Sequence, residues 1–96
     1  MQSKNKKPMT RFERAHVERV KALPCAVCGT EKEGREAHEM KQGLWFLVLP
    51  LCPDCHRGSR NGLHCQRAMW NIMKKTEELC LHETLTKLYG GMYERQ

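Results

Sequence analysis

Four cysteines in two Cys-x-x-Cys pairs are the residues of this sequence best suited to bind a metal ion. The first pair is Cys25 with Cys28, and the second pair is Cys52 with Cys55. Tetrahedral zinc takes four soft ligands with zinc–sulfur bonds of about 2.3 Å, and the thiolates of two such pairs can supply them. The stretch between the pairs is long enough for a hairpin that returns the chain to the first pair. We therefore predict one structural Zn²⁺ on these four cysteines.

Two other chemistries use the same cysteine motif. A rubredoxin-like iron site also has two Cys-x-x-Cys pairs, but His56 stands where the second rubredoxin pair is followed by glycine. A redox-active Cys-x-x-Cys is expected as a single pair in a βαβ setting, whereas this chain has two pairs and no such pattern. Both alternatives fit the sequence less well than zinc.

Three of the five histidines lie between the first cysteine pair and the C-terminal helical segment: His38, His56 and His64. His56 follows Cys55 directly, so bound zinc would fix its backbone. The glycine-flanked loop at residues 58–62 can bend His64 back towards His56. Two imidazoles on one divalent ion, with the third as a nearby general base, would make a phosphodiester-hydrolysing site. The structural alternative is that His56 and His64 only cap helices and bind phosphate.

The elements that must position these residues begin with an N-terminal helix. Thr10 and Glu13 have the form of a capping box, which predicts a helix start at Thr10. Pro24 ends the helix just before the first cysteine pair. Residues 44–49 form a short apolar run that predicts a strand, with residues 37–40 as its hairpin partner.

Helix is predicted for the C-terminal part of the chain. Residues 52–57 indicate a turn that enters a short helix. A long helical segment follows from about Leu63 to a stop at Gly90, with His64 at its start. The sequence does not decide whether the helix breaks near Leu81 or His82.

The remaining cysteines and histidines are interpreted as structural. Cys65 and Cys80 lie at helical spacing on the inner face of the long segment, which indicates buried apolar residues. His16 and His82 fall in predicted helices without neighbouring ligands, so we interpret them as structural or surface residues.

The chain of 96 residues corresponds to one domain. We expect a disordered basic arm at residues 1–9 and a single zinc-containing domain at residues 10–96. No apolar run is long enough to cross a bilayer, and residues 1–8 lack the apolar centre of a secretion signal. We therefore expect a cytosolic (cytoplasmic) protein without membrane contact, whose cysteines stay reduced.

Positive charge is concentrated at the start of the chain. The net charge is +6, and residues 1–24 hold seven basic residues against two acidic ones. A basic arm that leads into a basic helix suits a polyanion such as nucleic acid, held through its phosphate backbone. The alternative is a tail that only keeps the protein soluble.

Several short motifs point to a known family when they are taken together. They are Cys25-x-x-Cys28-Gly29, Ala37-His38, Leu51-Cys52-x-x-Cys55-His56-Arg57-Gly58 and Gly62-Leu63-His64. This set, within residues 24–90, resembles the HNH or His-Me finger endonucleases, and most closely the Ref-like phage recombination nucleases. In those proteins an apolar strand runs into Pro-Leu-Cys, followed by a His-Arg-Gly turn and a histidine that opens a tryptophan-containing helix. The matching residues here are Pro50-Leu51-Cys52, His56-Arg57-Gly58, His64 and Trp70.

The resemblance implies a ββα-metal core that hydrolyses phosphodiester bonds. His38 then takes the position of the general base that activates water. His56 ligates the catalytic divalent ion (Mg²⁺, Mn²⁺ or Zn²⁺), and His64 is a further ligand or a phosphate contact. Arg57 and Arg60 stabilise the charge that develops on phosphate. The resemblance also implies a setting in phage or prophage recombination and a RecA filament as a partner.

The identity of the base depends on how Ala37-His38-Glu39 aligns with the relatives, many of which have Asp-His or His-His there. If His38 matches the first member of a His-His pair, Glu39 becomes the base, but we favour His38. Glu36 or Glu39 would then supply a carboxylate to the ion or to His38. Many HNH proteins also place an asparagine, which orients the base, near the position of Leu47.

We therefore expect an α+β domain with a zinc-stabilised treble-clef or ββα-metal core and flanking N- and C-terminal helices. Its expected function is metal-dependent DNA endonuclease activity that nicks DNA with little sequence preference. The alternative from a different class is a non-catalytic zinc module that binds nucleic acid or a recombination protein. A zinc deaminase, which uses His-x-Glu followed by Pro-Cys-x-x-Cys, fits poorly, because the order around His38 is Glu36-Ala37-His38-Glu39 and the second cysteine pair reads Pro50-Leu51-Cys52.

Overall fold

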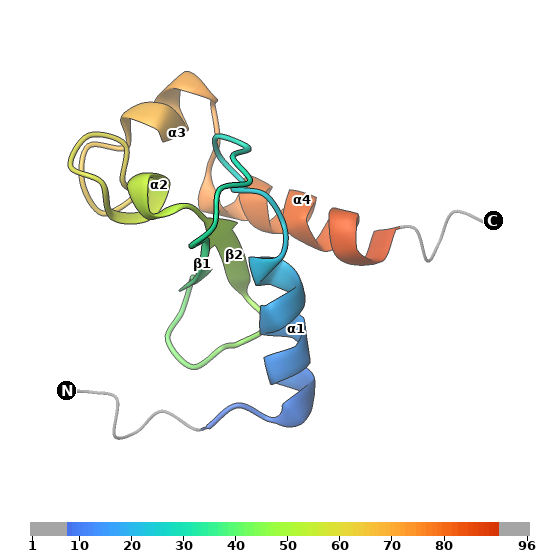
Figure 1. The fold of residues 1–96 in the computed structure, drawn as a ribbon. Helices are drawn as coiled ribbons and strands as arrows, with labels where there is room; N and C mark the ends of the chain where they lie inside the picture. Colours follow the sequence, from blue (N-terminus) through green and yellow to red (C-terminus); the bar gives the residue numbers. More distant parts are fainter. Residues whose placement is uncertain (1–7, 91–96) are drawn as a thin grey trace.

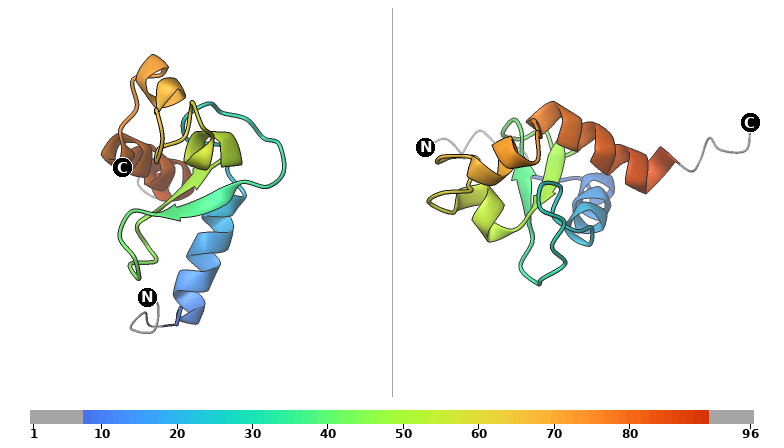
Figure 2. Two further views of the ribbon diagram at one scale, coloured as in Figure 1. Left: turned by 90° about the vertical axis from the view of Figure 1, so that its left-hand side faces the viewer. Right: turned by 90° about the horizontal axis from the view of Figure 1, so that it is seen from above.

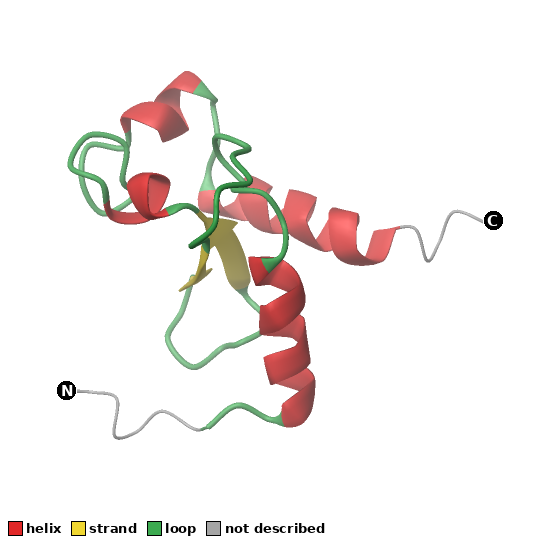
Figure 3. Ribbon diagram, in the orientation of Figure 1, coloured by secondary structure: helices red, strands yellow, loops and turns green. Residues whose placement is uncertain are grey.

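The computed structural model describes residues 8–90, in which four helices and two strands form an α+β fold (Figure 1, Figure 3). In chain order they are α1 (Arg11–Lys21), β1 (Glu36–Glu39), β2 (Val48–Leu51), α2 (Pro53–Arg57), α3 (Ala68–Ile72) and α4 (Glu77–Tyr89). The α+β class predicted from the sequence is confirmed. Most of the predicted basic arm, residues 1–7, lies outside the described residues. Within residues 8–90, no helix is both long enough and apolar enough to cross a membrane.

Helix α1 starts at the predicted capping box. The Thr10 hydroxyl accepts a hydrogen bond from the Glu13 N–H at 3.1 Å, and the Thr10 N–H donates to a Glu13 carboxylate oxygen at 2.8 Å. The helix ends before Pro24, as expected. Val20 on its inner face is buried against Val48 of β2, so α1 covers one side of the sheet.

Strands β1 and β2 form an antiparallel pair in which His38 lies opposite Leu49 and Glu36 lies opposite Leu51. Successive side chains of a strand point to opposite faces. Glu36 and His38 therefore share one face, while Ala37 packs on the other face beside α1. Figure 2 shows α1 and α2 on opposite sides of the two strands. The hairpin thus separates an apolar side from a side that carries the histidine.

The predicted strand at residues 44–49 was wrong in position, because β2 spans Val48–Leu51. Leu44 and Phe46 are each 49% exposed, and the Leu44 N–H donates to the Lys41 carbonyl at 3.1 Å in a turn. All four residues of β2 are buried, and both α1 and α4 pack against this strand. Covering by helices, and not apolar composition alone, determines which part of the run is a strand.

The single long helix predicted from Leu63 was also wrong, because residues 73–76 separate α3 from α4. Lys74 adopts a left-handed conformation with φ of 57°, which interrupts the helix. The Thr76 hydroxyl then caps α4 by accepting a hydrogen bond from the Leu79 N–H at 3.1 Å. Two glutamates in the first turn favour a helix start at the same place. The break therefore lies ahead of the position near His82 that the sequence left open.

Because the predicted helix started too early in the sequence, the predictions for two residues in it were also wrong. His64 lies in a turn that precedes α3 and does not open a helix. Cys65 is exposed, contrary to the prediction, because its turn projects into solvent, whereas Cys80 on α4 is buried as predicted. His16 is buried in α1 and His82 is exposed on α4, and neither joins a metal-binding cluster among the described residues.

Trp70 attaches α3 to the rest of the fold. Its side chain is 2% exposed, and its indole N–H donates to the Cys55 carbonyl at 2.9 Å. The hydrophobic cluster around it contains nine buried residues: Cys25, Val27, Leu49, Leu51, Cys52, Cys55, Leu63, Trp70 and Cys80. Three of the four cysteines that are predicted to bind zinc are therefore part of the core itself, while Cys28 is exposed.

We expect Trp70→Phe to lower the free energy of unfolding by about 1–3 kcal/mol, because it leaves the buried Cys55 carbonyl without its donor. Thermal or urea unfolding of the zinc-loaded protein measures this change. Ile72→Ala in the same helix is the control, since Ile72 is 69% exposed and such surface changes stay within about 0.5 kcal/mol. Equal unfolding of both variants would contradict the structural role of the Trp70 hydrogen bond.

Candidate metal centres

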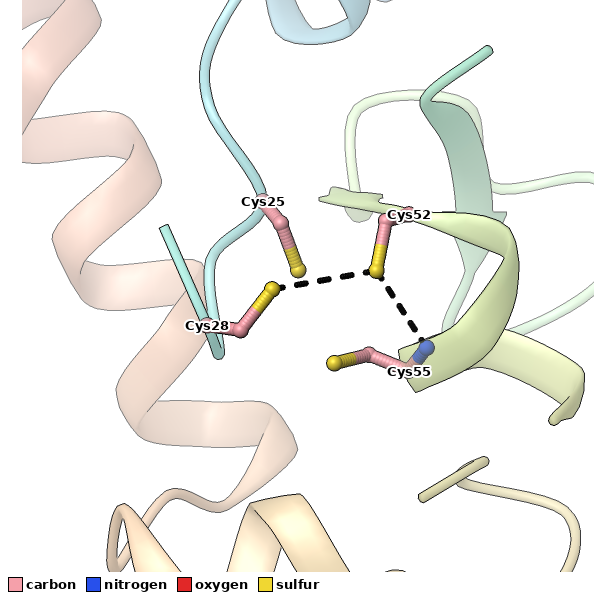
Figure 4. Close-up of side chains that lie close together, drawn as sticks. All are labelled: Cys25, Cys28, Cys52 and Cys55. Atoms are coloured by element: carbon pink, nitrogen blue, oxygen red, sulfur yellow. Dashed lines mark hydrogen bonds between the residues drawn. The ribbon is translucent and has the colours of Figure 1, made fainter. Parts of the chain in front are cut away.

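The four cysteines of the two pairs converge in one cluster, as Figure 4 shows. Cys25 and Cys28 come from the turn that follows α1, and Cys52 and Cys55 come from the start of α2. The four sulfurs lie within 4.8 Å of one another, with Cys28 Sγ 3.8 Å from Cys52 Sγ. Zinc–sulfur bonds of about 2.3 Å in a tetrahedron place sulfurs about 3.8 Å apart. The cluster can therefore hold a structural metal such as zinc.

Backbone N–H groups in both pairs are placed to donate hydrogen bonds to cysteine sulfurs. The Val27 N–H points to Cys25 Sγ at 3.5 Å, and the Cys55 N–H points to Cys52 Sγ at 3.4 Å. Gly29, directly after the first pair, has a positive φ of 78°, a conformation that glycine adopts without strain. Hydrogen bonds of this kind favour the thiolate form of cysteine.

Burial works against ionisation of the same sulfurs. It is the largest influence that raises the pKa of the Cys55 thiol, and neighbouring charge on Cys25 adds to the effect. Four thiolates this close therefore repel one another unless a cation lies among them. This requirement agrees with the geometry in indicating a metal-binding cluster.

The three histidines at positions 38, 56 and 64 form a second cluster beside the first. Their ring centroids are 5.0, 5.4 and 5.5 Å apart, and each offers a nitrogen within 4.8 Å of the others. His38 is buried in β1, His56 is partly buried in α2, and His64 is exposed in the turn before α3. The structure thus brings together all three histidines that the sequence singled out.

Glycine makes the return of His64 towards α2 sterically feasible. A Cβ atom at Gly62 would lie 2.5 Å from the Gly58 carbonyl oxygen, and a Cβ atom at Gly58 would lie 2.6 Å from the Asp54 carbonyl oxygen. Both contacts are too close for any other residue in this backbone. The Leu63 N–H then donates to the Cys55 carbonyl at 2.9 Å, which places His64 next to α2.

Two carboxylates hold two of the histidines from outside the cluster. Glu36 Oε1 lies 2.7 Å from His56 Nδ1, and Glu77 Oε2 lies 2.7 Å from His38 Nε2. The Arg57 guanidinium binds both oxygens of Glu36. Hydrogen bonding to Arg57, followed by that to His56, outweighs burial and lowers the pKa of Glu36 to about 2. Glu36 is therefore ionised next to His56 at neutral pH.

The sequence interpretation identified one of these carboxylates and missed the other. Glu36 was expected to serve the ion or His38, and it binds His56 and Arg57 instead. Glu77 was not anticipated, because only the fold brings the start of α4 next to β1. Glu39, the alternative base, is not in the cluster and accepts a hydrogen bond from the Gly43 N–H at 3.1 Å.

Comparison of this chain with protein-family models, with curated proteins and with solved structures finds no match.

Replacement of Cys52 by serine should reduce the zinc content from about one ion per chain to nearly none and unfold much of the domain. The physical reason is that the zinc-binding free energy of such small domains is coupled to folding. Metal analysis after dialysis, together with circular dichroism, measures both effects. Cys65→Ser is the control, since Cys65 is exposed and lies outside the cluster. If Cys52→Ser keeps its zinc, the four-cysteine assignment is wrong.

Proposed function

We propose that this chain is a metal-dependent DNA endonuclease of the HNH type. The observation that carries the proposal is the convergence of three imidazoles from a β-hairpin, a short helix and a turn, directly beside four clustered cysteines. A hairpin followed by a helix is the arrangement expected of a ββα-metal core, with the four cysteines as its structural zinc site. We also propose that the two cysteine pairs and the elements around them form a treble-clef zinc site.

The histidine cluster fits a divalent ion because neutral imidazole nitrogen is a common ligand of such ions. His56 Nε2 points into the cluster, since His56 Nδ1 binds Glu36 on the outside. His64 faces both other rings from its turn. A divalent ion held there supplies Lewis-acid activation of water and neutralises charge on a phosphate oxygen. His56 and His64 are the residues proposed to hold it.

His38, and not Glu39, is the side chain of β1 that can act at this site. Adjacent residues of a strand point to opposite faces, so Glu39 is directed to the face that carries Ala37. His38 Nδ1 lies 3.2 Å from His56 Nε2, at the centre of the cluster. Two roles suit this nitrogen: it can accept a proton from the attacking water, as the resemblance implies, or it can bind the ion.

Exposed arginines near the cluster are suited to bind DNA phosphates. Arg57 is held beside His56 by Glu36, and Arg60 and Arg67 lie exposed on the loop that carries His64. Helix α1 has four more exposed basic side chains: Arg11, Arg14, Arg19 and Lys21. Contacts of this type give affinity without sequence preference. The proposed substrate is therefore duplex DNA held by its backbone, with a RecA filament as the proposed partner and recombination as the setting.

The alternative of a non-catalytic zinc module makes a different prediction about metal content. A module of that kind binds one zinc per chain at the cysteines, whereas the proposed nuclease also binds a second ion at the histidines. Metal stoichiometry therefore separates the two functions before any assay of activity.

Nicking of supercoiled plasmid tests the proposed activity. The parent should convert it to the open circle in the presence of Mg²⁺, Mn²⁺ or Zn²⁺, and His56→Ala or His64→Ala should each lower the rate by at least about 100-fold. His82→Ala is the control, because His82 is exposed on α4 away from the cluster. The assay is run with and without a RecA filament, since the resemblance implies that one is required.

Equal nicking by the parent and by both site variants would show that any activity comes from elsewhere. A parent that binds the second ion but cuts no DNA under any of these conditions, with or without the filament, would remove the nuclease proposal.

DNA binding should depend steeply on salt. Replacing Arg60 by glutamine should reduce the slope of log K against log salt concentration by about 0.9, the value for one lost phosphate contact on duplex DNA. Fluorescence anisotropy at several salt concentrations measures the slope. Lys87→Gln, near the opposite end of α4 from Glu77, is the control. An unchanged slope for Arg60→Gln would exclude Arg60 from the DNA interface.

A further inference from the structure

The outer hydrogen bonds of His38 and His56 determine which nitrogen of each ring carries a proton. Glu77 Oε2 lies 2.7 Å from His38 Nε2, and Glu36 Oε1 lies 2.7 Å from His56 Nδ1. An ionised carboxylate only accepts hydrogen bonds, so the ring nitrogen that faces it must donate. In the neutral rings the protons therefore lie on His38 Nε2 and His56 Nδ1.

The inner nitrogens of the two rings are consequently both acceptors. His38 Nδ1 and His56 Nε2 face each other at 3.2 Å. Two lone pairs at hydrogen-bonding distance repel unless a cation lies between them. Either a shared proton or a metal ion would satisfy both nitrogens.

The third ring distinguishes between these two cations. A proton joins only two nitrogens, but His64 lies 5.5 Å from His38 and 5.4 Å from His56 between ring centroids. All three rings offer a nitrogen within 4.8 Å of the others. Zinc–nitrogen bonds of 2.0–2.1 Å at tetrahedral angles place two ligand nitrogens about 3.3 Å apart, which is close to the observed 3.2 Å. A metal ion, unlike a proton, can therefore bind all three rings.

We propose that His38, His56 and His64 together bind one transition-metal ion, with Glu77 and Glu36 as the carboxylates that orient two of the ligands. The inference rests on the ion site of the proposed function and changes one role in it, because His38 becomes a metal ligand in place of a general base. Imidazole ligands suit zinc and its neighbours in the first transition series, whereas Mg²⁺ prefers oxygen. The site therefore selects Zn²⁺ or a similar ion over Mg²⁺.

Glu77 has a defined part in this arrangement. It lies in the first turn of α4 and binds the nitrogen of His38 that faces away from the cluster. A carboxylate in this position fixes the tautomer and the ring orientation of a metal-binding histidine and makes it a stronger ligand. Glu77 is thus a positioning residue, through which the C-terminal helix reaches the ion site.

Cobalt binding to the zinc-loaded protein tests the inference without reference to DNA cleavage. Isothermal titration calorimetry and visible absorption should show one Co²⁺ per chain beyond the zinc, and millimolar Mg²⁺ should not displace it. His38→Gln should weaken Co²⁺ binding by more than about 100-fold, the upper end of what loss of an outer carboxylate costs. Glu77→Gln should weaken it by about 10-fold. Glu78→Gln removes the same charge from the same helical turn, at an exposed residue, and should leave the affinity unchanged.

X-ray absorption at the cobalt edge gives a second readout that requires no variant. Three imidazole nitrogens on cobalt in the parent protein support the inference, and two overturn it. Zinc content and circular dichroism show whether His38→Gln folds. If it does not fold, the absorption measurement on the parent protein decides the question.

The outcomes separate this inference from the proposed function. If His38→Gln binds Co²⁺ as tightly as the parent but no longer nicks DNA, His38 is a general base, and the nuclease proposal stands without the third ligand. If Co²⁺ binds through three imidazoles and the protein cuts no DNA, the ion site stands and the nuclease proposal fails.

Discussion

The mutual repulsion of four clustered thiolates, three of them buried, is the constraint on which the rest of this fold depends. Cys25, Cys52 and Cys55 lie in the main hydrophobic cluster, so the chain cannot bury them as ionised groups without a cation beside them. The cysteine turns also carry other elements. The Ala26 N–H donates to the Pro50 carbonyl at 2.8 Å, which joins the first turn to β2, and the Cys55 carbonyl accepts from Trp70 and from Leu63. Metal binding at the cysteines is therefore connected by single hydrogen bonds to the hairpin, to α3 and to the turn that holds His64.

The histidine cluster depends on parts of the chain that are far apart in sequence. Glu36 and His38 come from the hairpin, His56 from the helix that follows it, and Glu77 from the last helix. Each carboxylate binds its histidine from outside, so ring orientation is set by charged hydrogen bonds in addition to packing. The orientation of His56 therefore depends on β1, and the orientation of His38 depends on the first turn of α4.

Local signals in the sequence were sufficient for the parts of the structure that local interactions determine. The capping box at Thr10 and the pairing of cysteines within each Cys-x-x-Cys motif follow from residues a few positions apart, and the ligand number of zinc predicted that the two pairs converge. The apolar run at residues 44–49 gave a wrong position for the strand. Leu44 and Phe46 remain exposed, and helices cover only β2, which starts at Val48. The continuous helical spacing after Leu63 concealed the left-handed Lys74 and the cap at Thr76. The role of Glu77 could not be predicted at all, since it arises from the packing of α4 against β2.

The alternation of side chains along β1 limits how the length of this chain can vary. Because Glu36 and His38 share a face with α2, and Ala37 shares the other with α1, one residue inserted within β1 would exchange the two faces. The buried histidine would then be directed at the valines of α1, and an alanine would take its place in the cluster. The loop between the strands carries no such parity, but Trp45 packs beside the valines of α1 and the Phe46 ring lies 5.3 Å from the His16 ring. A change in the length of this loop would disturb only these two contacts with α1, whereas a one-residue change within β1 would turn His38 away from the cluster.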